Sequence, residues 1–181
     1  MSPRRRAWWG LLILAAGAAL LVMQLRARRA RALRMDYCLR VQASCLGPSL
    51  GQEQALIDLL AKPRRGKADR AAALDLMRGL RDCWRFSGDL HASAPEEVFF
   101  VPLDQAVIWV GQSVQVGDDA MHLDPRRDAG ILKMALDGLR GNLTEQRRNL
   151  LAFAGACKDL PWTPEQARDL DRWAQSLQPG R

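Results

Sequence analysis

The most constraining feature of this sequence is an uncharged apolar stretch near its amino terminus, from residue 7 to residue 25. Gln24 is the one strongly polar side chain within it. A helix over this stretch would be about 28 Å long, which matches the hydrocarbon core of a bilayer. We therefore expect residues 7–25 to form a single transmembrane anchor, behind a basic tail over residues 1–6. The lipid-facing side chains would include Trp8, Trp9, Leu11, Leu12, Ile13, Leu14, Leu20, Leu21 and Val22.

A cleaved signal peptide is the competing interpretation of the same stretch. Arg4–Arg6 would be its basic region, and residues 30–32 have the small-x-small form of a cleavage site. That site lies well past the apolar stretch and behind Arg26, Arg28 and Arg29, so an uncleaved anchor is favoured. The arginines on the two sides nearly balance, and the positive-inside rule hardly discriminates between orientations. Because a short basic tail need not be translocated, we expect a cytoplasmic amino terminus, an inner-membrane location and a periplasmic carboxy-terminal domain.

The positive charge is confined to the amino-terminal end of the chain. Residues 1–35 contain eight arginines and no acidic residue, whereas the rest carries 19 basic against 20 acidic side chains, out of a total net charge of +7. A nucleic-acid-binding domain would carry its basic excess on the folded part, where it could neutralise phosphates, so no nucleic-acid partner is expected. Low hydrophobicity combined with high net charge is also absent from residues 36–181, which argues against disorder.

The remaining sequence predicts helices joined by short breaks. Residues 26–46 form an expected stalk helix that ends at Gly47-Pro48, and residues 47–181 form an expected helical soluble domain. A short helix over 52–61 would be followed by a basic loop and by a helix over 68–86 that ends at Ser87-Gly88-Asp89. The apolar face of the second helix would consist of Ala73, Met77, Leu80, Trp84 and the adjacent Cys83.

The second half of the domain gives stronger helix signals after one ambiguous segment. Residues 103–117 fit a helix, with a short β-hairpin near 98–117 as the alternative. Asp124-Pro125 resembles a helix start, and a kink or restart near Asn142 is expected in the helix that follows. Thr163-Pro164-Glu165-Gln166 has the spacing of a capping box. Inward-facing residues would be Leu132, Leu136, Leu139, Leu143 and Leu150, and in the last helix Leu170, Trp173, Ala174 and Leu177. The predicted fold class is a small all-α bundle behind one anchor.

The four cysteines are spaced too widely for a zinc ribbon or a redox motif. Cys38 and Cys45 are seven residues apart on one predicted helix, about 10 Å along its axis, and a disulfide needs Cα atoms within about 7 Å. They therefore should not pair with each other. We expect bridges between helices, Cys45 with Cys83 and Cys38 with Cys157, or with the partners exchanged. Free buried thiols are the alternative.

Two charged segments are candidate binding sites. Asp118, Asp119, His122 and Asp124 are weak candidates for a divalent cation site, but a solvated acidic turn is the commoner outcome, and no metal or cofactor is predicted. A basic docking loop could contact an acidic protein surface or anionic headgroups, through Lys62, Arg64, Arg65, Lys67 and Arg70. A solvated loop between two helices is the commoner outcome for such a segment. Ala15 and Ala19 offer a small-residue face for helix pairing, but the sequence does not set an oligomeric state.

The sequence carries no nucleophile elbow, no His-Glu-x-x-His helix and no glycine-rich phosphate loop. Catalytic residues are therefore not assigned and an enzymatic role is not expected. The leading hypothesis is a single-pass, membrane-anchored interaction module, a non-catalytic subunit or adaptor of a bacterial envelope assembly whose partners are the bilayer and other envelope proteins. The alternative is a periplasmic sensor, ligand-binding or toxin-neutralising domain, suggested by the 118–124 segment and by Phe99-Phe100.

Overall fold

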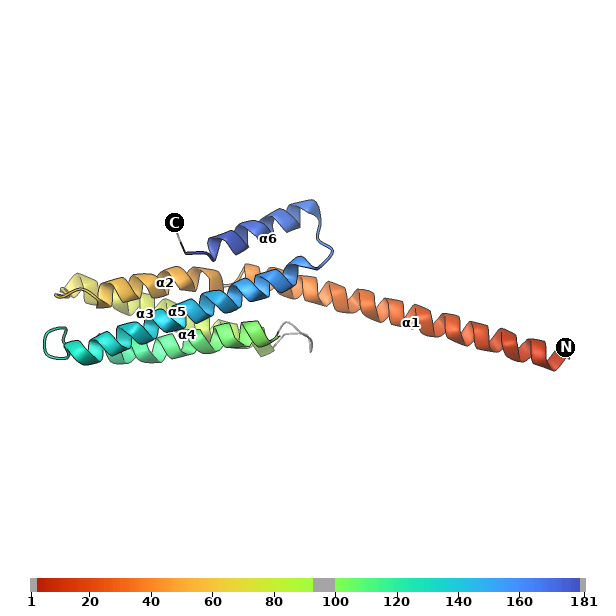
Figure 1. Cartoon of the computed structure of the whole chain (residues 1–181), viewed down its shortest axis with the longest axis horizontal. Helices are drawn as coiled ribbons and strands as arrows, with labels where there is room; N and C mark the ends of the chain where they lie inside the picture. The colour runs from red at the N-terminus through yellow and green to blue at the C-terminus, as the bar shows by residue number, and fades with distance from the viewer. Residues whose placement is uncertain (1–2, 93–99, 180–181) are drawn as a thin grey trace. The chain divides into compact units, whose positions relative to one another are not determined.

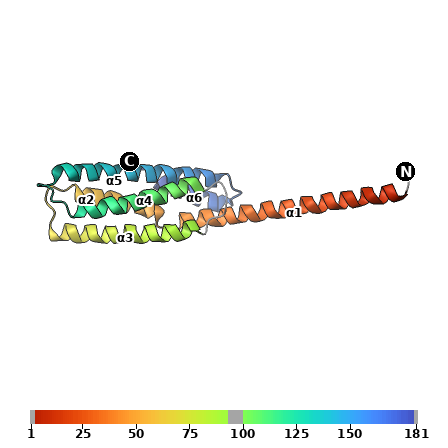
Figure 2. The same ribbon diagram turned by 90° about the horizontal axis from the view of Figure 1, so that it is seen from below.

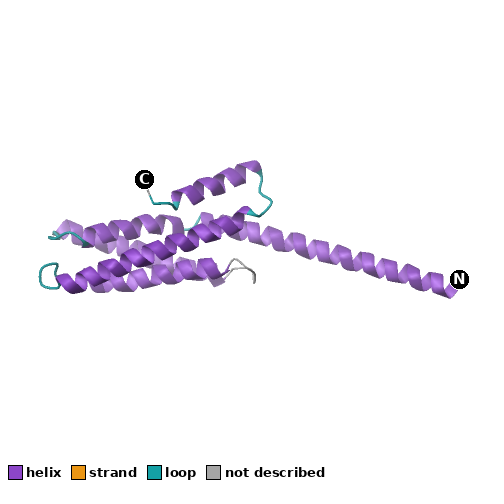
Figure 3. Ribbon diagram, viewed as in Figure 1, coloured by secondary structure: helices purple, strands orange, loops and turns teal. Residues whose placement is uncertain are grey.

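The computed structural model describes the backbone of residues 3–92 and 100–179, and the side chains of residues 8, 14–90 and 102–179. All regular secondary structure among the described residues is helical, which confirms the all-α prediction (Figure 3). The helices are α1 (Pro3–Gln42), α2 (Leu46–Leu60), α3 (Lys67–Ala92), α4 (Phe100–Met121), α5 (Ala129–Lys158) and α6 (Pro164–Ser176). The chain divides into two compact units, residues 1–36 and residues 37–181, and α1 contains the boundary between them.

In the first unit, α1 is a regular helix through the apolar stretch and the arginines that follow it. Among the residues whose structure is described, none of the helices combines the length and the apolar character that crossing a membrane requires. Part of the predicted anchor is exposed in α1, namely Trp8, Leu14, Leu20, Leu21 and Val22. The side chains of Trp9, Leu11, Leu12 and Ile13 lie outside the described residues.

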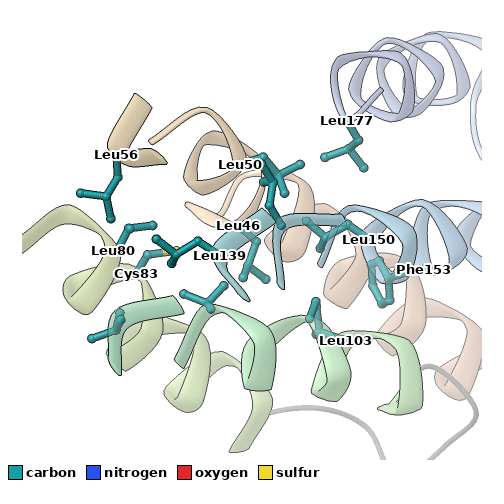
Figure 4. Packing of buried hydrophobic residues seen from close by; sticks show 14 of the residues in the cluster. Leu46, Leu50, Leu56, Leu80, Cys83, Leu103, Leu139, Leu150, Phe153 and Leu177 are labelled. Carbon is teal, nitrogen blue, oxygen red and sulfur yellow. The ribbon is translucent and has the colours of Figure 1, made fainter. Parts of the chain in front are cut away.

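In the second unit, α2, α3, α4 and α5 form a four-helix bundle in which consecutive helices pack together and α5 closes the ring against α2 (Figures 1 and 2). Figure 4 shows leucines from all four helices meeting in one core, among them Leu46, Leu80, Leu103 and Leu139. α6 packs against α5 and contributes Leu170 and Trp173 to this core, with Leu177 following the helix. The bundle therefore buries one apolar stripe from each helix, as the 3.6-residue periodicity requires.

The break between the first two helices lies earlier than Gly47-Pro48, so the predicted stalk boundary was wrong. α1 ends at Gln42 and α2 begins at Leu46. The hydroxyl of Ser44 donates to the carbonyl of Val41 at 2.6 Å and accepts the amide of Leu46 at 3.2 Å, which satisfies the backbone in the turn. Pro48 is tolerated inside the first turn of α2, because the amides of that turn have no carbonyl to bond within the helix.

Two predicted helix breaks are absent from the structure, and the helix predicted over residues 103–117 is confirmed. α3 continues through Ser87-Gly88-Asp89, because the Ser87 hydroxyl donates to the Cys83 carbonyl one turn back at 2.7 Å instead of ending the helix. The 103–117 segment is helical, so the hairpin alternative fails within the described residues. α5 is continuous through Asn142, whose side chain is buried, so the predicted kink is also wrong. In each case a continuous buried stripe outweighs the local helix-breaking preference.

The helix after Asp124-Pro125 starts later than predicted. One carboxylate oxygen of Asp124 accepts the amides of Arg126 and Arg127 at 2.8 and 3.0 Å, so Asp124 stabilises a turn, and α5 begins at Ala129. The capping box of the last helix is confirmed, since the Thr163 side chain accepts the Gln166 amide and the Gln166 side chain accepts the Thr163 amide.

Both disulfides form between different parts of the bundle, which confirms the predicted pairing. Cys38 in α1 is bonded to Cys157 in α5, with Cα atoms 6.2 Å apart, and Cys45 is bonded to Cys83 in α3, with Cα atoms 5.6 Å apart. Next to the first bond, the rings of Tyr37, Phe153 and Trp173 stack edge to face. The premise that Cys38 and Cys45 share one helix was wrong, because Cys45 lies at the N-cap of α2.

Candidate interaction site: a basic cleft at one end of the bundle

Two loops lie side by side at one end of the bundle, at its left in Figures 1 and 2. One joins α2 to α3 and the other joins α4 to α5. Arg65 of the first loop donates from its two terminal nitrogens to the carbonyl oxygens of Ala120, at 3.4 Å, and of Leu123. Ala120 lies in the last turn of α4 and Leu123 follows the helix, at the end where the helix dipole favours a cation. Arg65 therefore ties the two loops together.

The surroundings of Arg65 are strongly positive. Burial of its guanidinium lowers the pKa of Arg65, and the neighbouring charge of Arg70 lowers it further, against the opposing effect of Asp124. The shift therefore reflects first the burial of the guanidinium and second its repulsion by the cation of Arg70. An anion bound between the two arginines would relieve that repulsion.

The space beside Arg65 is a cleft of about 780 Å³, here named the basic cleft. It combines an apolar part from α3 and the end of α4 with charged side chains from the two loops and from the start of α3. Its lining residues are Arg65, Arg70, Leu74, Met121, His122, Leu123, Asp124, Arg126 and Arg127. Four arginines thus face one carboxylate.

That carboxylate does not neutralise the cleft. Hydrogen bonds from the backbone amides of Arg127 and Arg126 lower the pKa of Asp124 and occupy one of its oxygens. Arg127 is paired with Asp128, at 3.2 Å between nitrogen and oxygen, but its side chain remains 82% exposed. In the described part of the chain no ion pair is found for Arg70 or Arg126. The cleft therefore presents unbalanced positive charge and several N–H donors, which suit a carboxylate or phosphate.

The structure divides the predicted basic docking loop into residues with different environments. Lys62 is paired with Asp69 at 2.6 Å, and Arg64 is exposed. Lys67 is the first residue of α3, so the basic segment is not all loop. Of the five predicted residues, Arg65 and Arg70 line the basic cleft.

The four predicted cation ligands also lie in different environments. Asp118 is paired with Arg81 of α3, Asp119 is exposed, and His122 and Asp124 line the basic cleft. Within the described ranges, no group of three or more His, Cys, Asp or Glu side chains converges on a point that could hold a metal ion. Residue 99 and the side chain of Phe100, which motivated the ligand-binding alternative, lie outside the described residues.

Arg126 and Arg127 are the charged cleft residues that the sequence did not identify as site candidates. Their signal is a basic pair directly after Asp124-Pro125, but it sits beside acidic residues that cancel it in any count of local charge. Only the fold brings this pair next to Arg65 and Arg70, so that four arginines line one cleft with a single carboxylate.

A buried polar cluster in the bundle core was also missed. Glu53 of α2 is fully buried and accepts a hydrogen bond from the hydroxyl of Ser113 in α4. Nearby residues of α2 and α5 pair as well, since the amide of Gln146 donates to the hydroxyl of Ser49 at 2.6 Å. Burial raises the pKa of Glu53 to about 7, although the Ser113 hydrogen bond and the charge of Arg147 both act to lower it.

Comparison with models of protein families, with curated proteins and with solved structures finds no match to this chain.

Proposed function

We propose that this chain is a membrane-anchored interaction module, a non-catalytic subunit or adaptor of a bacterial envelope assembly, and that its helical bundle binds an acidic segment of a partner protein. The observation that carries the proposal is the basic cleft. Four arginines surround a concave surface with an apolar part, and its one carboxylate is engaged by the backbone. Arginine forms paired hydrogen bonds with carboxylates, and Leu74, Met121 and Leu123 can pack against apolar side chains of the same segment.

The anchor and the compartment are further parts of the proposal, and they are supported by the sequence. Residues 7–25 carry no charge, are flanked by arginines and have the length of a bilayer core. Two disulfides between helices suit an oxidising compartment such as the periplasm, because cytosolic thiols are kept reduced. In this proposal the amino terminus is cytoplasmic and the bundle is periplasmic.

The binding test uses the full-length chain in nanodiscs and a fluorescent peptide rich in Asp, Glu and Leu. We expect saturable binding that weakens steeply with added salt, since the cleft charges are exposed. Arg70→Glu and Arg126→Glu should each weaken it about tenfold or more, because each places a carboxylate in the ligand's path. Arg148→Glu is the matched control, since Arg148 is exposed on α5 and does not line the cleft.

Equal binding by Arg126→Glu and Arg148→Glu would contradict the proposed role of the cleft. For the assembly itself, affinity purification from mild detergent should recover envelope proteins with the wild-type chain and lose them with Arg70→Glu. A wild-type chain that elutes alone would count against the proposal.

A further inference from the structure

A second concave surface lies between α6 and the start of α2, away from the basic cleft. This α2–α6 groove has a volume of about 690 Å³, within the usual range for small-molecule sites. Leu50 of α2, Trp173 of α6 and Leu177 after it form its apolar base and are largely buried, while Ala43 and Pro48 are exposed at its rim. The rim residues and the outer edges of the base offer apolar surface for the body of a ligand.

Arg147 of α5 is the one ionisable side chain that lines the groove. It is half-buried, its Nε has no hydrogen-bond partner, and no ion pair is found for it among the described residues. The other polar lining residues are neutral, such as Gln54 of α2. A cation at an apolar surface, in a groove whose lining contains no carboxylate, favours an anionic ligand.

The carboxyl group of Glu53 interacts electrostatically with Arg147 but offsets little of its charge. Glu53 is fully buried in the core, and burial raises its pKa to about 7, against smaller lowering effects of Ser113 and Arg147. Near neutral pH a substantial fraction of Glu53 is therefore protonated. When Glu53 is protonated, no negative charge from it competes with a ligand for Arg147.

Trp173 gives the groove a defined wall. Its indole packs so closely on α2 that a Cβ atom at Gly47 would lie 3.2 Å from the indole Nε1. This Nε1 is buried and lacks a hydrogen-bond acceptor. On its other side the ring meets Phe153 edge to face, with centroids 6.5 Å apart. These contacts hold the ring in place, and a rigid aromatic wall lowers the entropic cost of binding.

We infer that the α2–α6 groove binds a small carboxylate with an apolar body, with Arg147 holding the carboxylate and Leu50, Trp173 and Leu177 contacting the body. This site is separate from the basic cleft and does not rest on the proposed function. Two sources share this chemistry, a short fatty acid and the carboxy-terminal end of a peptide.

The test follows the indole N–H resonance of Trp173 in the full-length chain, labelled with ¹⁵N-tryptophan in nanodiscs. Loss of one resonance in Trp173→Phe assigns it, and the resonances of Trp8 and Trp9 report any partitioning of the probe into lipid. The probes are N-acetyl-Leu-Phe with a free carboxylate, the same dipeptide as its amide, and hexanoate. We expect a saturable shift with at least one free acid and none with the amide. A shift with the dipeptide alone identifies a peptide end, and a shift with hexanoate alone identifies a fatty acid.

Arg147→Gln should weaken binding of the active acid on the order of tenfold, the value of one charge-assisted hydrogen bond. Gln54→Glu adds a repelling carboxylate at an exposed lining position without touching the core, so it should weaken binding even if Arg147→Gln perturbs the fold. Arg148→Gln, on the exposed face of α5, should bind as the wild type does. Equal binding of acid and amide, unchanged affinity in both groove variants, or no shift with either acid would overturn the inference.

Discussion

Replacing Glu53 by Gln should stabilise the bundle, and the gain should depend on pH. Glu53 is fully buried in α2, with one carboxylate oxygen bonded to Ser113 and the other without a partner. The helices packed against Glu53 offer few groups that could stabilise its negative charge. Arg147 of α5 is the one charged group that is resolved as acting on Glu53. The buried residues of α3 carry no charge, and α4 supplies the neutral Ser113. A buried carboxylate with so few partners is costly when ionised.

The size of the effect follows from the pKa of Glu53. The pKa rises from 4.5 for an ordinary Glu to about 7 in the folded chain, and each pH unit between these values contributes about 1.4 kcal/mol, so the total is about 3 kcal/mol. Below pH 4.5 the carboxyl group is neutral in both states, and its stabilising contribution is fully present. As the pH rises to about 7 the unfolded chain releases a proton that the folded chain retains, so this contribution is lost.

Gln has nearly the same shape, accepts the same Ser113 hydrogen bond and cannot ionise. The two proteins should therefore unfold with similar free energies at pH 4.5, whereas at pH 8 the Glu53→Gln variant should be more stable by about 3 kcal/mol, or roughly 6–12 °C in Tm. Urea and thermal unfolding followed by circular dichroism at pH 4.5, 6 and 8 measure the difference, in which other titrating groups cancel. Glu165→Gln, on the exposed first turn of α6, is the control and should show little pH dependence. A difference that is the same at pH 4.5 and 8, or a wild type that is the more stable at pH 8, would refute the reasoning.

Three further outcomes are expected. Reducing both disulfides should lower the free energy of unfolding by about 2–4 kcal/mol per bond, and mass mapping of the oxidised chain should find Cys38 bonded to Cys157 and Cys45 to Cys83. Trp173→Ala should cost on the order of 3–5 kcal/mol, because it removes a ring that packs on Phe153, and an unchanged melt would mean that α6 contributes no packing energy. A periplasm-active reporter fused after Arg181 should be active and a cytoplasm-active one silent, and the reverse would exclude the proposed orientation.

Much of the bundle could be predicted from apolar periodicity, because a helix that buries one face must repeat its apolar residues on that face. The stripes of α3 and α5 were read correctly, including Met77, Leu80 and Leu139. Trp84 was placed on the buried face but is 40% exposed, since it lies at the edge of the stripe beside Gly111 of α4. Periodicity gives the direction of a face within about one residue position and does not locate its edge.

Helix ends were predicted less well, because Gly, Pro, Ser and Asp were read as local stop signals. Ser87 and Asn142 show why this failed. The hydroxyl of Ser87 bonds within its own helix, and Asn142 is buried among the apolar residues of α5. Thr163 was read correctly because a capping box satisfies the backbone with residues that are adjacent in sequence. A stop signal that depends on tertiary packing cannot be evaluated from the sequence alone.

The candidate sites were the least predictable part, since charge acts through distances that only the fold sets. Arg65 and Arg126 are 61 positions apart in sequence and line one cleft, where Asp124 is the one carboxylate among four arginines. Glu53 looks like an ordinary surface carboxylate in the sequence, with Gln on both sides, yet it is buried on the stripe of Leu46, Leu50 and Leu60.

Since a buried ionisable group costs stability, the presence of Glu53 there in place of an apolar residue calls for a compensating interaction. Arg147 is the cation resolved as acting on it, and it also lines the α2–α6 groove. An anion bound to Arg147 would therefore raise the pKa of Glu53 further, so ligand binding in the groove and proton uptake in the core should be coupled with the same sign.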